Sequence, residues 1–358
     1  MSVRPEVVAA FEAQIRWCMK LGSPFTAAVL GAALDDLRAG GPVARLLGGW
    51  LGDPAADALP LRLAGGLHAL VLSGRDGALA ALYPPHGQGG GQGGRQGGGP
   101  GEGAGRALAT VLPDAVARHD GFLRDWLTSP PQTNEVGRAG VLLGGFLEIA
   151  QDFRLPLHLL EIGASAGLNM VWDRFRYDIA GAGWGDGDSP VVLAPHWTGP
   201  RPPLEAPLTI AGCAGCDRRP VDITQETERL RLRAFVWADQ PARMRALEGA
   251  MDLALRLGTR VEAADAADWV ERHLAAAQPE VVTVLYHTIV WQYLPTGTQA
   301  RIRMALDGYG VLAPLAWLRL ELGPTDRCEL TLTTWSRGLR TERVLAEAHP
   351  HGAWVRWG

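Results

Sequence analysis

The sequence predicts an α/β protein in which a mostly parallel sheet follows an all-helical N-terminal domain. In the first part of the chain the apolar residues recur at helical spacing. From residue 157 onward, short apolar runs alternate with helical segments, which is typical of a parallel sheet with helices on both faces. The last strands are joined by short loops, so we expect an antiparallel edge. The expected domains are residues 1–130 and 131–358.

The N-terminal domain is predicted from apolar spacing and from helix end signals. Helical patterns cover residues 5–80, 107–128 and, just before the first strand, 134–152. Residues 61–72 are apolar nearly all round and are expected to be buried. Residues 87–105 (GQGGGQGGRQGGGPGEGAG) are of low complexity and cannot bury enough surface to offset their ordering entropy. We expect this segment to form a flexible surface insertion.

The second domain is predicted as strands that alternate with helices. Candidate strands cover residues 157–162, 208–216, 259–264, 281–287, 311–321 and 328–335, with short strands near 340–345 and 352–357. Helices are expected over residues 166–175, 224–257, 266–276 and 297–308. In folds of this kind, ligands bind outside the carboxyl ends of the strands. The residues that follow the strands are therefore the candidate site residues.

Composition excludes several classes of protein. The net charge of −4 argues against a nucleic-acid-binding protein, which normally has a basic excess. No apolar run approaches the roughly 18 residues of a membrane span, and Glu6 and Glu12 do not suit a signal peptide. Cys213 and Cys216 have the spacing of a metal-binding pair, but no second pair accompanies them. We expect a soluble cytoplasmic protein without a metal, a nucleic-acid partner or a membrane partner.

The most informative segment is LHLLEIGASAGLN, residues 157–169. An apolar run contains Glu161 near its end, and the small residues Gly163, Ser165 and Gly167 follow at alternate positions. Small residues let a ligand approach the backbone, and a helix N-terminus offers free N–H groups. The acidic residue favours a ligand with positive charge or hydroxyl donors. This combination suits a nucleoside with a cationic amino-acid tail better than a bare phosphate.

The same letters allow other interpretations. G-x-S-x-G is also the nucleophile elbow of a serine hydrolase, with Ser165 as nucleophile and His287 or His351 as base. That fold needs strands before the elbow, where this chain is predicted to be helical. A dinucleotide fingerprint is disfavoured because Leu168 stands at its third glycine position. A purely structural turn is the remaining alternative.

Four longer words resemble the bacterial DUF2332 family, a family of unknown function that is regarded as methyltransferase-like. They are QTNEVGR (132–138), EIGASAGLN (161–169), WADQP (237–241) and VWQYLP (290–295). Within the second word, Glu161-x-Gly163-x-x-x-Gly167 resembles motif I of class I S-adenosylmethionine-dependent methyltransferases. Ser165 stands where that motif usually has glycine, and its Cβ restricts the backbone. The resemblance covers most of the chain.

The resemblance implies a Rossmann-like class I methyltransferase fold, S-adenosylmethionine as cofactor, and methyl transfer to a small-molecule acceptor. A protein that binds the cofactor without catalysis is the alternative. Asp217, at the end of the second strand, is expected to accept the ribose hydroxyls, unless it is only a turn residue. The implied cofactor-binding residues are Glu161, Gly163, Ala164, Ser165, Gly167, Asn169, Asp217, Asp265, Ala266, Asn134, Glu135 and Arg138.

Individual roles follow from the same resemblance. Asp265 would meet the adenine, with Asp268 as the N-cap of the next helix. His287, just after an apolar strand, would line the acceptor side as a general base or hydrogen-bond its own loop, with Tyr286 and Tyr293 nearby. The QTNEVGR word would lie over the amino-acid end of the cofactor, or merely supply an N-cap at Thr133 or Asn134. The WADQP word would form a lid or a helix kink.

Overall fold

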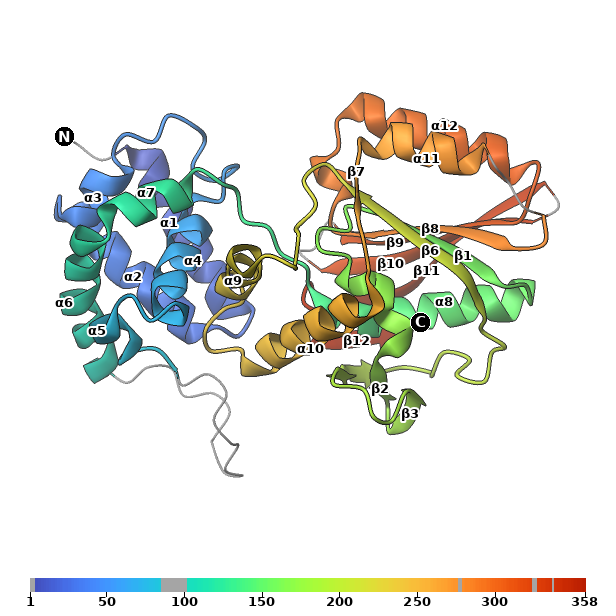
Figure 1. Ribbon diagram of the computed structural model, residues 1–358, viewed down its shortest axis with the longest axis horizontal. Helices are drawn as coiled ribbons and strands as arrows, with labels where there is room; N and C mark the ends of the chain where they lie inside the picture. Colours follow the sequence, from blue (N-terminus) through green and yellow to red (C-terminus); the bar gives the residue numbers. More distant parts are fainter. Residues whose placement is uncertain (1–3, 85–101, 276–278, 324–326, 337) are drawn as a thin grey trace. The chain divides into compact units, whose positions relative to one another are not determined.

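The computed structural model describes residues 4–84, 102–275, 279–323, 327–336 and 338–358 (Figure 1). The chain forms two compact units, Met1–Thr133 with Gln225–Met244, and Asn134–Thr224 with Arg245–Gly358. Residues 225–244 were expected in the second domain but belong to the helical unit. The glycine-rich residues 85–101, most of the expected surface insertion, lie outside the described residues.

Helices alone make up the first unit within the described residues. Proline opens α1, α2 and α3, at a helix position where the missing N–H costs nothing. As predicted from its apolar sequence, α4 is buried on nearly all sides. None of the helices in the described ranges has the length and apolar character of a membrane span. The helices are α1 (Pro5–Lys20), α2 (Pro24–Arg38), α3 (Pro42–Leu47), α4 (Leu59–Leu72), α5 (Gly77–Ala80), α6 (Glu102–Arg118), α7 (Asp120–Leu127) and α9 (Glu226–Ala234).

The WADQP segment separates α9 from α10 (Pro241–Leu257), so the single helix expected over residues 224–257 is two helices. In this segment, Oδ2 of Asp239 accepts a hydrogen bond from the backbone N–H of Phe25 at 2.9 Å. The other carboxylate oxygen, Oδ1, accepts a hydrogen bond from the Ser23 hydroxyl. These contacts satisfy the first turn of α2 in the same unit. The interruption between the two helices thus places Asp239 at the N-terminus of α2, where it caps that helix.

The second unit contains a nine-stranded sheet in the order β5-β12-β11-β10-β9-β8-β1-β6-β7. The strands from β7 to β9 are parallel, those from β9 to β12 are antiparallel, and β5 pairs in parallel with β12. This confirms the predicted α/β class and antiparallel edge. The strands are β1 (Leu157–Ile162), β5 (His196–Thr198), β6 (Ile210–Asp217), β7 (Glu262–Ala263), β8 (Val282–Thr288), β9 (Leu315–Leu322), β10 (Cys328–Ser336), β11 (Leu339–Ala348) and β12 (Trp354–Trp357).

The strand order reverses beside β1. From β1 the chain adds β6 and then β7 on one side, and then adds β8 and β9 on the other side. In open α/β sheets, ligands bind at the carboxyl ends of the strands beside such a reversal. The residues that follow β1, β6 and β8 therefore define the region to inspect for a functional site.

Helices cover both faces of the sheet (Figure 1). One face is covered by α8 (Ala139–Phe153), and the other by α11 (Ala266–Leu274) and α12 (Thr296–Gly310). Two glycines bring α8 close to the sheet. A Cβ on Gly144 would lie 2.4 Å from the Trp357 ring, and one on Gly145 would lie 2.5 Å from Leu318. The small residues of α8 are thus required by packing.

Short elements account for most differences from the predicted secondary structure. A separate three-stranded sheet of β2 (Arg176–Ile179), β3 (Ala182–Gly185) and β4 (Val192–Leu193) was not predicted. Its hairpin turns at Ala180 and Gly181, both at positive φ, but the pair Ala-Gly lacks the Asn-Gly or Asp-Gly signal of such turns. The expected helix over 166–175 is a 3₁₀ segment, η2 (Leu168–Arg174), and the expected strand 259–264 is only β7.

The packing of α8 gives a testable prediction. Gly144→Ala should lower the free energy of unfolding by about 1–2 kcal/mol, because overpacking outweighs the gain in helix propensity. The Trp357 ring cannot easily yield, since it is buried and stacked on Trp197 at 5.3 Å. Urea unfolding followed by circular dichroism measures the change.

Gly308→Ala in α12 is the matched control, because a Cβ there meets nothing within 4 Å. It should raise the free energy of unfolding by about 0.5–1 kcal/mol. Equal stabilisation by both substitutions would contradict the proposed contact between α8 and Trp357.

Candidate functional site

A tight turn follows β1 at the strand reversal. Gly163, Ser165 and Gly167 have φ values of 68°, 55° and 74°, which glycine adopts readily and serine does not. Space is restricted as well. A Cβ on Gly163 would lie 2.5 Å from Cγ2 of Val290, and one on Gly167 would lie 2.9 Å from Cγ2 of Val261. Both glycines are therefore required by conformation and by packing.

The backbone N–H groups of this turn donate to acceptors within the protein. The N–H of Ser165 donates to Oδ2 of Asp217 at 3.0 Å. The N–H groups of Ala166 and Leu168 both donate to Oδ1 of Asn134, at 3.2 and 2.9 Å. The expectation that free N–H groups of the turn would receive a ligand is therefore wrong for these three residues.

Asn134 and Glu135 hold the turn rather than capping a long helix. The expected N-cap at Thr133 or Asn134 is wrong, because Glu135 is the N-cap of the short η1 (Val136–Arg138), accepting from Gly137 N at 3.3 Å. The Glu135 carbonyl also accepts a hydrogen bond from Nδ2 of Asn169 at 3.3 Å. Two consecutive residues thus hold the C-terminal side of the turn.

Gly137 and Arg138, at the end of the QTNEVGR segment, contact the loop after β11 and the end of β8. Gly137 leaves no room for a side chain, since its Cβ would lie 2.3 Å from the carbonyl oxygen of His351. Arg138 donates through Nε to the Pro350 carbonyl at 2.9 Å and through Nη1 to the Thr288 carbonyl at 3.2 Å. These contacts give Arg138 a role in fixing the loops at the carboxyl edge of the sheet.

Glu161 lies in the interior with Tyr286. Both are buried, and the Tyr286 hydroxyl donates to Oε2 of Glu161 at 3.2 Å. Burial raises the pKa of Glu161 to about 8, with a smaller upward effect from Asp217, although the Tyr286 hydrogen bond lowers it. Burial also raises the pKa of Tyr286 well above its usual value. At neutral pH the Glu161 side chain is therefore mostly protonated, and it does not attract a cation by charge.

Unsatisfied polar atoms lie at the turn. In the described part of the chain, Oγ of Ser165 and Oδ1 of Asn169 are buried and have no hydrogen-bond partner. Asp217, half-buried at the end of β6, accepts one backbone N–H at each oxygen, from Ser165 and from Arg219 at 2.8 Å. Each of its carboxylate oxygens keeps capacity for a further donor.

The end of β7 differs from the prediction in one role. Asp265 is itself the N-cap of α11, accepting from Ala267 N at 2.9 Å, so the cap expected at Asp268 is wrong. The helix begins one residue after Asp265, at the buried Ala266. Asp268 is exposed in the first turn, where Arg301 Nη2 lies 2.7 Å from its Oδ1.

His287 is a core residue. Its side chain was expected to line the acceptor side at the end of the strand 281–287, but β8 extends to Thr288 and His287 is fully buried within it. The indole N–H of Trp317 donates to its Nε2 at 3.1 Å. Because an indole is only a donor, Nε2 carries no proton, and Nδ1–H donates to Oε1 of Glu321 at 2.6 Å. Both ring nitrogens are therefore engaged.

Glu321, which the sequence analysis missed, orders the loop after β8. The same oxygen that binds His287 accepts from the backbone N–H groups of Val290 and Trp291, at 3.1 and 3.3 Å. Burial alone would raise the pKa of Glu321. The hydrogen bonds and the adjacent imidazole together lower it by more than burial raises it, so the net pKa is below its usual value. Trp291 stacks on His287 with centroids 5.3 Å apart. The expected site residue Tyr293 is 71% exposed.

The two cysteines of β6 do not form a metal site. Cys213 and Cys216 are three positions apart on one strand, so their side chains point to opposite faces of the sheet. Searched residue by residue, the described ranges contain no group of three or more His, Cys, Asp or Glu side chains that could hold a metal ion.

The role of Asn134 can be tested by removing its acceptor oxygen. Asn134→Ala should lower the free energy of unfolding by about 2–4 kcal/mol, because it leaves two buried N–H groups without a partner. Amide hydrogen exchange at Ala166 and Leu168 should accelerate in step. Asp178→Ala is the matched control, since it removes an acceptor for Gly181 N in an exposed turn where water can replace it. Similar effects of both substitutions would contradict the role of Asn134.

The raised pKa of Glu161 predicts a pH dependence of stability. Between about pH 4.5, the usual value, and pH 8 the folded state holds a proton that the unfolded state has lost. Stability should therefore fall as pH rises through this window, by up to about 1.4 kcal/mol per pH unit. Urea unfolding at several pH values measures the slope. Glu161→Gln should remove this contribution, and an unchanged slope in the variant would refute it.

The comparison with known families agrees with the sequence words that meet at the turn. A family model, described as an uncharacterized protein conserved in bacteria (DUF2332), matches residues 8–357. No curated protein and no solved structure matches the chain. Because the family model covers nearly the whole sequence, the chain belongs to the DUF2332 family.

Proposed function

We propose that the second unit has a Rossmann-like class I methyltransferase fold and transfers a methyl group from S-adenosylmethionine to a small-molecule acceptor. The observation that supports this most is the position of Asp217 beside the glycine turn. The turn follows β1, Asp217 ends the neighbouring β6, and both lie where the strand order reverses. In doubly wound folds this combination binds a nucleoside, with the carboxylate on the ribose hydroxyls.

The residues present fit such a cofactor. Asp217 has acceptor capacity for hydroxyl groups, and Ser165 and Asn169 contribute buried polar atoms that lack partners within the described residues. A ligand with several donors and acceptors would satisfy them, as buried polar groups require. Asp265 and Ala266, at the start of α11, are placed by this proposal on the adenine side. The N–H groups of Ser165, Ala166 and Leu168 already donate to side chains of the protein, so they are not available to bind a phosphate. This disfavours a dinucleotide.

Methyl transfer from S-adenosylmethionine requires few catalytic groups of the protein. When bound, S-adenosylmethionine supplies a methyl group that is already activated on a sulfonium. The protein has to align the acceptor with it and exclude water. His287 does not act as the general base in this proposal, because both its nitrogens are engaged. The proposal therefore favours an acceptor whose attacking atom is already deprotonated near neutral pH.

Two alternative functions are weighed by specific observations at His287 and Ser165. A protein that binds the cofactor without catalysis fits the engaged His287 equally well. A serine hydrolase is disfavoured, because Oγ of Ser165 contacts no base among the described residues. A cytoplasmic location is part of the proposal, since the free thiols of Cys18, Cys213, Cys216 and Cys328 suit a reducing compartment.

Calorimetric titration with S-adenosylmethionine tests the proposal. The wild-type protein should bind with micromolar affinity, about −8 kcal/mol. Asp217→Asn should weaken binding by about tenfold or more, because a charged acceptor for hydroxyl groups is lost. Absence of binding at millimolar ligand would overturn the proposal. Stoichiometric labelling of Ser165 by a fluorophosphonate would favour the hydrolase instead.

Asp178→Asn is the matched control for Asp217. Asp178 also accepts a backbone hydrogen bond in a turn, from Gly181 N at 2.8 Å, but it is exposed and lies on the separate three-stranded sheet. Its substitution should leave the affinity unchanged. Equal affinity of wild type and the Asp217 variant would exclude the proposed ribose contact.

A further inference from the structure

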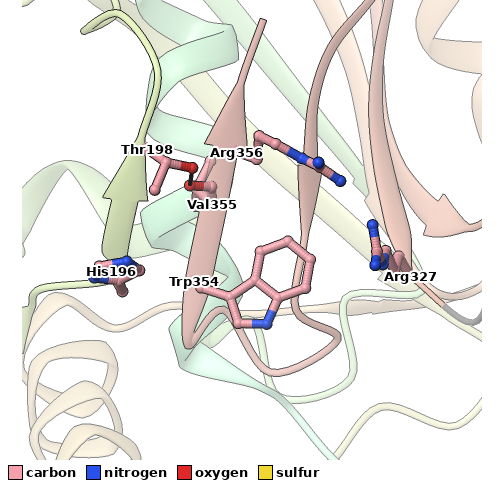
Figure 2. A pocket seen from close by; sticks show the side chains of 6 residues that line it. All are labelled: His196, Thr198, Arg327, Trp354, Val355 and Arg356. Atoms are coloured by element: carbon pink, nitrogen blue, oxygen red, sulfur yellow. Dashed lines mark hydrogen bonds between the residues drawn. The ribbon is translucent and has the colours of Figure 1, made fainter.

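A pocket of about 240 Å³ lies at the opposite edge of the sheet, between β5 and β12 and the start of β10 (Figure 2). It is lined by His196, Thr198, Arg327, Trp354, Val355 and Arg356. None of these residues belongs to the proposed cofactor site. Four strands separate β12 from β1, which at about 4.8 Å per strand spacing gives a distance of about 24 Å.

Strand register explains why these side chains meet. Trp354 and Arg356 are two positions apart on β12, so they point to the same face of the sheet. The parallel pairing with β5 places His196 beside Trp354 and Thr198 beside Arg356. The intervening Val355 points to the other face and is fully buried, and it contributes its backbone to the pocket.

The two arginines converge on one side of Trp354 (Figure 2). Glu347 holds both, with Oε2 at 3.0 Å from Nη1 of Arg327 and in contact with Nη2 of Arg356. The Arg327 guanidinium carbon is 6.0 Å from the centroid of the Trp354 ring, at the outer limit of cation–π contact. The indole is therefore not tightly covered by the guanidinium.

The lining is mostly apolar, and its permanently charged groups are the two guanidiniums. Each guanidinium has five N–H groups, and the carboxylate of Glu347 leaves most of them available. The Thr198 hydroxyl donates to the Val355 carbonyl at 3.3 Å, which engages that acceptor. Glu347 is the cross-strand neighbour of Arg356 on the same face of the sheet, and it offsets part of the charge of both arginines.

We propose that this pocket binds a small aromatic carboxylate, with the carboxylate on Arg356 and Arg327 and the ring against Trp354. The pocket is smaller than the roughly 300–1,000 Å³ of pockets for drug-sized ligands, so the ligand is small. A carboxylate offers two acceptors in the planar geometry that guanidinium groups match, and an aromatic ring suits the apolar part of the lining. The site is separate from the proposed cofactor site and does not depend on it.

Titration with benzoate, followed by NMR of the ¹⁵N-labelled indole groups, tests the proposal. Trp354→Phe assigns the Trp354 signal. We expect benzoate to shift this signal saturably in the millimolar range, with benzamide and acetate each weaker by about tenfold, because one lacks the charge and the other lacks the ring. Equal binding of benzamide or acetate, or no saturable shift, would overturn the proposal.

Substitutions locate the effect. Arg356→Gln should weaken benzoate binding by about tenfold. Arg340→Gln is the matched control, because Arg340, like Arg356, lies on a strand and pairs with a glutamate, but it lies outside the pocket. An effect of both substitutions, or of neither, would refute the site. Binding of S-adenosylmethionine should be the same in Arg356→Gln and wild type, so the two proposals fail independently.

Discussion

The carboxamide oxygen of Asn134 is the constraint on which the candidate site depends. A turn that follows a central strand and enters a short 3₁₀ segment leaves several backbone N–H groups without partners. Asn134 accepts two of them at once, and Asp217 accepts a third. Because a buried N–H without an acceptor costs about 1–3 kcal/mol, the turn keeps its left-handed residues only while these acceptors are in place.

The loop after β8 is fixed by a second buried acceptor. Glu321 binds His287 and the N–H groups of Val290 and Trp291, and this places Val290 over Gly163. The two loops at the strand reversal are thus held by side chains from outside the loops themselves. Asn134 comes from the segment before α8, and Glu321 comes from the end of β9. A preorganised edge of this kind suits a ligand that is aligned rather than activated.

Sequence patterns were sufficient for the class of fold and insufficient for side-chain roles. The strand Leu157–Ile162 was predicted with its observed bounds, because six residues, four of them apolar, stand between a proline and a glycine. Asp217 was also placed correctly at a strand end. The role of Glu321 left no local signal, since its partners are about 30 residues away. The predicted strand contained His287, but a strand pattern does not show that Trp317 and Glu321, distant in the sequence, enclose its side chain.

The two edges of the sheet differ for a topological reason. Parallel strands need crossover connections, and these place α11 and α12 over the strands from β6 to β9. The antiparallel strands from β9 to β12 are joined by short loops that carry no helix in the described chain, so they add no further cover. Side chains such as Arg356 and His196 therefore remain exposed on that face. The crossover connections cover the parallel strands and leave the far edge open, where polar and aromatic side chains line the pocket between β5 and β12.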